Sequence, residues 1–126
     1  VVSQHLILIG CSSTCNGFGM SMSMTQRPFA VNLKFSIKPE RRDDFLSLMK
    51  ENQVKTLETE AAALQHVVGE DITEPNTFYL HEQFTSEQGF IDHRDTPHVS
   101  DWIQFRNSDP FTNGGEPIYH FYFGTH

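Results

Sequence analysis

Cysteine is scarce in this sequence of 126 residues. Its two cysteines, Cys11 and Cys15, both lie in the first 27 residues, and the remaining chain has none. No disulfide framework therefore supports a fold in that remaining part. The C-x3-C spacing, with no further cysteine nearby, also matches no common zinc motif.

Long apolar runs and positive charge are scarce as well. No stretch approaches the roughly 20 apolar residues that a membrane-spanning helix needs. The sequence has nine Lys and Arg against sixteen Asp and Glu, so its formal net charge is -7. An acidic chain repels phosphate backbones, which argues against nucleic acid as a partner. The chain also lacks a Gly-x-Ser-x-Gly elbow, a Walker loop, a dinucleotide fingerprint and a nucleophilic Cys–His arrangement.

Phenylalanine, by contrast, is abundant, with eleven residues in a chain that is 37% hydrophobic. Each buried ring removes a large apolar area from water, and the length fits one domain with one core. We predict a single domain over residues 28–126, preceded by a flexible tail of residues 1–27.

The tail is rich in Ser, Gly and Met, and three interpretations of it stay open. The segment LIGCSS resembles a bacterial lipoprotein cleavage box, although its apolar run is short and no basic segment precedes it. The Ser-rich, acid-free composition also fits the end of a plastid or mitochondrial transit peptide. The third interpretation is leftover sequence outside the domain proper. The location is accordingly open between the cytoplasm and an organelle.

Strand and helix patterns alternate along the domain. Period-two alternation predicts strands at residues 28–38, 64–71, 77–84 and 117–124. Helical spacing of apolar residues predicts a first helix from Pro39 to Leu57, extending at most to Ala63. A second helix is predicted over residues 87–94 with Ser86 as N-cap, and Pro97 ends it or starts a further piece through Phe105.

The resulting order, βαββαβ, predicts an α+β fold of the ferredoxin-like type. It has a four-stranded antiparallel sheet with both helices on one face. The last strand carries apolar side chains on both sides: Tyr119, Phe121 and Phe123 on one, Ile118, His120 and Tyr122 on the other. Because large apolar patches mark association sites, we predict that a second copy covers the face without helices, as a homodimer.

The stretch from Thr77 to Phe105 holds the most distinctive polar residues. Glu82 falls into an otherwise apolar row of its strand, where a carboxylate is costly to bury without a partner. The following helical part supplies His93 and His98. Because histidine titrates near neutrality, His93 can take a proton from a phenol or an α-hydroxyketone. We predict that Glu82 and His93 line a cavity between sheet and helices.

Structural explanations remain open for the same side chains. Glu82 can accept hydrogen bonds from the helix or a partner subunit, and His98 can cap a turn. A metal site of His93, His98 and Glu82 would combine two imidazoles with one carboxylate. However, H-x4-H is no metal motif, and the two rings would point about 140° apart on an unbroken helix, so we predict no metal.

Further candidates lie on the strands. Asn32, on the small-residue face of the first strand, either stabilises an oxyanion or bonds a neighbouring strand. Histidines at positions 66, 81 and 120 cluster only if they share a face. The predicted substrate-contacting residues are His66, Tyr79, His98, Trp102 and His120, although a place in the core or dimer surface fits Tyr79 and Trp102 better.

The block FYLHEQFTSEQGFIDHRDTPH (residues 78–98) resembles antibiotic biosynthesis monooxygenase-like domains, of the dimeric α/β-barrel superfamily. These share an aromatic strand with a Glu (here Glu82), a helix with a His (here His93), and then Thr-Pro-His (residues 96–98). The resemblance covers about residues 28–124 and implies a homodimer with a small-molecule substrate. One departure is the run Glu60-Ala61-Ala62-Ala63, where the family often has a Pro-Gly turn.

Two functional branches share this block. Quinol monooxygenases oxidise electron-rich phenols with O2 and need no metal or flavin, and an isomerase degrades the phosphorylated autoinducer-2 signal. A haem-degrading branch is similar at Asn32, but His93 stands at its usual Trp place and Ile103 near its haem-ligand place, so we do not expect haem degradation. The acidic domain argues against a phosphorylated substrate unless Lys34, Arg94 or Arg106 turns inward.

The resemblance therefore implies a monooxygenase, without cofactor, of a quinol-like or polyphenolic substrate. In it His93 would be the base, Asn32 would stabilise the oxyanion and Glu82 would orient His93. The alternatives are an isomerase of small hydroxyketones and a non-catalytic dimeric binding or assembly subunit.

Overall fold

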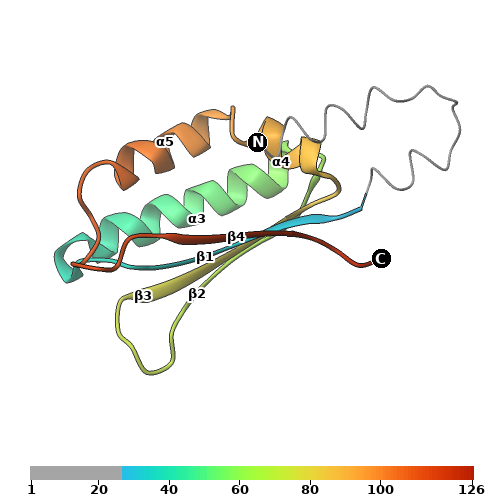
Figure 1. The fold of residues 1–126 in the computed structure, drawn as a ribbon. Helices are drawn as coiled ribbons and strands as arrows, with labels where there is room; N and C mark the ends of the chain where they lie inside the picture. Colours follow the sequence, from blue (N-terminus) through green and yellow to red (C-terminus); the bar gives the residue numbers. More distant parts are fainter. Residues whose placement is uncertain (1–26) are drawn as a thin grey trace, which may run out of the picture.

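The computed structural model describes residues 27–126, so the predictions for the tail with Cys11 and Cys15 lie outside the described residues. Four strands form one antiparallel sheet in the order β2-β3-β1-β4, and the helices lie on one face of it (Figure 1). The elements are β1 (Phe29–Ser36), η1 (Pro39–Arg41), α3 (Arg42–Thr59), β2 (Ala63–Glu70), β3 (Thr77–Phe84), α4 (Glu87–His93), α5 (Pro97–Arg106) and β4 (Ile118–Phe123). The predicted ferredoxin-like fold is confirmed.

The core lies between the two central strands and the helices. Alternate residues of β1 and β3 point toward the helices, and their register pairs Leu33 with Leu80 and Phe35 with Phe78. Phe35 is 1% exposed, and its ring centroid lies 5.3–6.4 Å from those of Phe45, Phe78, Trp102 and Phe111. Aromatic packing thus joins strands, helices and the segment before β4.

Local capping signals determine where the second helical region breaks. The Ser86 hydroxyl accepts a hydrogen bond from the Gly89 amide at 3.2 Å, which confirms Ser86 as the N-cap of α4. α4 ends at His93, and Pro97 is the first residue of α5, where its missing N–H costs nothing. The Thr96 hydroxyl caps α5 by accepting from the Val99 amide at 3.4 Å.

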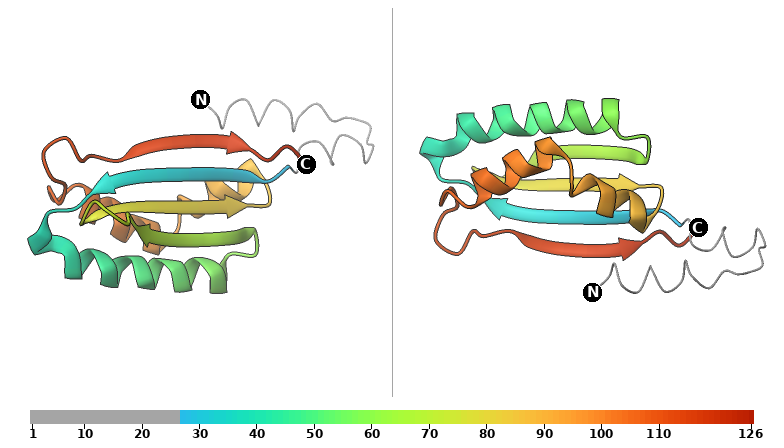
Figure 2. Two further views of the ribbon diagram at one scale, coloured as in Figure 1. Left: turned by 90° about the horizontal axis from the view of Figure 1, so that it is seen from below. Right: turned by 90° about the horizontal axis from the view of Figure 1, so that it is seen from above.

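The helices cover the sheet unevenly. Figure 2 shows α3 along the β2 side and α5 over the central strands, with β4 at the edge that they cover least. In β4, Phe121 is 48% and Tyr119 37% exposed although both sit on the helix side of the sheet. On the opposite face Val67, Tyr79, Ile118 and Tyr122 are each more than 40% exposed. One chain is described, so the homodimer stays a prediction.

Within residues 27–126, no helix combines the length and apolarity needed to cross a membrane.

Candidate active site

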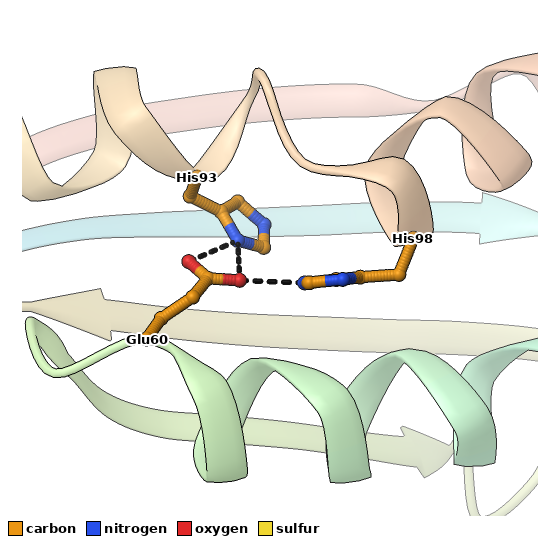
Figure 3. Close-up of side chains that lie close together, drawn as sticks. All are labelled: Glu60, His93 and His98. Carbon is orange, nitrogen blue, oxygen red and sulfur yellow. Dashed lines mark hydrogen bonds and ion pairs between the residues drawn. The ribbon is translucent and has the colours of Figure 1, made fainter.

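Five titratable side chains, four of them buried and that of Glu60 partly buried, form a connected row beneath the helices. His98 Nε2 lies 2.5 Å from Glu60 Oε2, and His93 Nδ1 lies 2.9 and 3.0 Å from the two Glu60 oxygens (Figure 3). His93 Nε2 lies 3.3 Å from Glu82 Oε2, and the same oxygen is 3.5 Å from His66 Nε2. Imidazoles and carboxylates therefore alternate in the order His98, Glu60, His93, Glu82, His66, which we call the histidine–glutamate row.

Each member of the row is positioned by the end or the inner face of an element. Glu60 is the first residue after α3, His93 is the last residue of α4, and His98 is the second residue of α5. His66 and Glu82 are direct partners in the register of β2 and β3 and both face the helices. Because the helix is interrupted between His93 and Pro97, the rings of His93 and His98 come to a centroid distance of 5.8 Å.

A cavity of about 130 Å³ lies beside this row, between the sheet and the helices. His66, Glu82 and His93 line it, and Glu82 and His93 are the two residues that the sequence placed at such a cavity. Trp102 adds an aromatic wall, and the remaining lining is mainly apolar. A polar group on one wall and apolar surface on the others suit a small ring with a hydroxyl substituent.

The pKa values of the two imidazoles beside Glu82 shift in opposite directions. Burial lowers the pKa of His66, and the opposing charge of Glu82 does not compensate. Burial alone would also lower the pKa of His93, but the hydrogen bonds and charges of Glu82 and Glu60 outweigh it and raise that pKa. Among the described residues, buried His66 Nδ1 has no hydrogen-bond partner. A neutral ring with one unengaged nitrogen can accept a proton.

The lowered pKa of His66 predicts a loss of stability in acid. Because the unfolded chain binds this proton more readily than the folded one, the free energy of unfolding should fall as the pH drops from above 6.5 through the lowered pKa. In His66→Gln this part of the pH dependence should disappear. Denaturant unfolding of both proteins between pH 8 and pH 5 measures it, and parallel curves would contradict the assignment. His93 has a raised pKa, so its contribution to stability weakens as the pH rises. Both proteins contain His93, so subtracting one curve from the other removes this opposite contribution.

The sequence-predicted residues fall into two groups. His66, Glu82, His93 and Trp102 line the cavity, and His98 reaches the row through Glu60. Asn32 and His120 are register partners on the opposite face of the sheet. One protomer therefore does not bring Asn32 to His93.

On that opposite face, the predicted residues have other partners. Asn32 Oδ1 lies 2.6 Å from His81 Nδ1, so the alternative of a bond to a neighbouring strand applies. The Tyr79 hydroxyl donates to Asp71 Oδ1 at 2.8 Å, and His120 is exposed. The three strand histidines do not cluster, since only His81 and His120 flank Asn32.

Sequence reasoning missed Glu60, which links His93 to His98. Its only signal was the departure from a Pro-Gly turn, which leaves a carboxylate at the helix end. The prediction left the helix end open between Leu57 and Ala63, and the observed end at Thr59 falls inside that range. Because the end was not fixed, the direction of the Glu60 side chain could not be predicted. Asn52, buried on α3, also lines the cavity and was not predicted.

Comparisons with known proteins agree with this architecture. Residues 28–104 match the family model described as antibiotic biosynthesis monooxygenase. No curated protein matches the sequence. A candidate antibiotic biosynthesis monooxygenase from Caulobacter crescentus has a TM-score of 0.72 at 14% identity, over 86% of this chain and 100% of that one.

Two further solved structures give the same result. A candidate antibiotic biosynthesis monooxygenase from Nitrosomonas europaea has a TM-score of 0.71 at 16% identity, over 80% of this chain and 93% of that one. A conserved protein from Methanosarcina mazei has a TM-score of 0.68 at 20% identity, over 80% and 96%. These identities establish the fold alone. The family match, which covers more than half of the sequence, shows that the chain belongs to the antibiotic biosynthesis monooxygenase family.

Proposed function

We propose that this protein is a monooxygenase that oxidises a single-ring hydroquinone with O2. The observation that supports this most is the cavity of about 130 Å³ that His66, Glu82 and His93 line. In an unrelated protein, an apolar cavity of about 150 Å³ holds benzene. The cavity therefore suits a single quinol ring better than a larger polyphenolic substrate, which the sequence left open.

In this proposal His66, a residue that lines the cavity, accepts the proton of a substrate hydroxyl. Glu82, 3.5 Å from Nε2 of the same ring, stabilises the imidazolium that forms. His93 contacts the same Glu82 oxygen from the other side and fixes its position. The sequence suggested His93 as the base, and the variants described in the Discussion distinguish the two assignments.

The substrate supplies all the electrons. One hydroquinone and one O2 give one hydroxyquinone and one water: a ring C–H becomes C–OH, and the second oxygen atom leaves as water. The four electrons that O2 takes up are those that the ring loses, so no external reductant enters the balance. The protein contributes binding, orientation and proton transfer.

Oxygen uptake with purified full-length chain tests the proposal. We expect one O2 consumed per hydroquinone, with hydroxyquinone as product, and a rate at least about tenfold lower for a three-ring hydroquinone, because wrong-sized rings lose apolar binding. Ile103→Phe adds a ring to a residue that lines the cavity and should lower the rate, whereas Ile72→Phe, at a residue that is 98% exposed, should not. Uptake no faster than uncatalysed autoxidation would refute the proposal.

A second candidate is the isomerisation of a small hydroxyketone with an acidic group. Arg94 and Arg106 both line the cavity, so cations are available at its wall for such a group. Turnover of hydroxyketones under anaerobic conditions, without hydroquinone-dependent O2 uptake, would favour this candidate. The non-catalytic alternative predicted an interior filled by side chains, and the cavity does not support it.

A further inference from the structure

Glu60, His93 and His98 converge from three different helix ends. We propose that they form a binding site for one divalent transition-metal ion, of the kind that Zn²⁺ represents. Each offers one donor atom, and the three donors lie within 4.8 Å of one another. Two imidazole nitrogens and one carboxylate oxygen are the donor set that Zn²⁺ and Fe²⁺ accept in proteins. The inference does not rest on the proposed function.

The distances leave room for an ion after a small movement. Zinc binds nitrogen and oxygen at about 2.0–2.2 Å, which places donors around one ion roughly 3.0–3.5 Å apart. The contacts of Glu60 with His93 Nδ1 and His98 Nε2 now span 2.5–3.0 Å. The carboxylate would have to separate from the two rings by less than about 1 Å, and the two ring nitrogens, which lie within 4.8 Å of each other, would have to come within about 3.5 Å.

The surroundings of His93 match those of a metal-ligating histidine. Such a ring donates its second N–H to a carboxylate, which fixes its tautomer and orientation. Here Nδ1 faces the proposed ion, and Nε2 lies 3.3 Å from Glu82 Oε2. Glu82 is thus positioned as the outer hydrogen-bond partner of the ligating ring. A simple ion pair between Glu60 and His93 would not need such a partner.

Burial favours a defined site over an adventitious surface one. The side chains of His93 and His98 are 4% and 5% exposed, and that of Glu60 is 12% exposed, which leaves an entry path past the carboxylate. Three protein donors leave at least one coordination position for water. An ion here would join the end of α3 to both sides of the break between α4 and α5.

The test is Zn²⁺ titration by calorimetry and Co²⁺ titration by visible absorption. It uses the full chain without an affinity tag and with Cys11→Ser and Cys15→Ser, because those thiols could bind either ion. We expect one ion per chain. Glu60→Gln and His98→Gln should each weaken binding at least about tenfold, and Glu82→Gln should weaken it about 10- to 100-fold as an outer partner. Glu58→Gln, on the exposed side of α3 two residues before Glu60, and His126→Gln at the exposed C-terminus are the matched controls and should change nothing.

Absence of stoichiometric binding by the folded chain would overturn the proposal. So would binding that Glu60→Gln and His98→Gln leave intact, since the ion would then lie elsewhere. Circular dichroism on each variant establishes whether it is folded. If Glu60→Gln does not fold, His98→Gln provides the test of the ligand set. Hydroquinone oxidation by chain treated with a chelator is measured separately, so failure of the metal site and failure of the proposed function give different results.

Discussion

Replacement of His66 by glutamine is expected to lower kcat for hydroquinone oxidation by about 10²- to 10⁴-fold, the usual contribution of a positioned proton acceptor. Glutamine keeps a polar side chain at this buried position but cannot accept a proton at neutral pH. Because the ring also contacts Glu82, the substitution removes the cation that this carboxylate would stabilise. Oxygen uptake at several substrate concentrations gives kcat and KM separately, and His126→Gln serves as the control for loss of an imidazole.

A comparison with His93→Gln assigns the base. If His66→Gln retains wild-type kcat while His93→Gln loses it, the base is His93, as the sequence suggested. His93 lies between two carboxylates, so its replacement also leaves Glu60 and Glu82 without the imidazole that they share. Thermal unfolding of both variants is therefore measured beside activity. The His66 assignment requires a folded variant that binds substrate but turns it over slowly.

Replacement of Phe35 by alanine is expected to lower the free energy of unfolding by about 3–5 kcal/mol, as for other large-to-alanine changes in a packed core. Phe35 is 1% exposed, and four other rings surround it. Its removal leaves a void that β1 cannot close without losing its pairing with both neighbouring strands. Urea denaturation measures the change.

Phe121→Ala is the matched control for that core substitution. Phe121 is 48% exposed on the edge strand β4, so its truncation removes less buried area and leaves a surface that water can fill. We expect less than half the loss found for Phe35→Ala. Equal losses would show that another surface covers β4 in solution. A measurement of molecular mass would then test whether that surface belongs to a second copy of the chain.

Most of the fold could be predicted because its signals are local. The strand from Thr77 to Phe84 matches its predicted range, since alternation, the Glu74-Pro75 turn and Ser86 mark both ends. Pro97, which was predicted either to end the helix or to start a further piece, is the first residue of α5. The end of α3 carries no Gly or Pro, so the prediction left it open between Leu57 and Ala63, and the observed end is Thr59.

The candidate site could be predicted only in part, because its contacts depend on distant elements. Glu82 and His93 were recognisable as an unusual carboxylate and an adjacent helix histidine. Their joint contact with Glu60 and His66 depends on the register of β2 against β3, which the sequence alone does not set. The position of Asn32 on the other face follows from alternation along β1, but whether that face belongs to the same site depends on a partner subunit.

The place where α3 stops has an evolutionary consequence. Each residue added to or removed from a helix rotates everything after it by about 100°. Glu60 directly follows α3, so a single-residue insertion or deletion within that helix would swing its carboxylate away from both imidazoles. Homologues that keep this carboxylate should therefore conserve the length of α3, while residue types vary mainly on the exposed side of that helix.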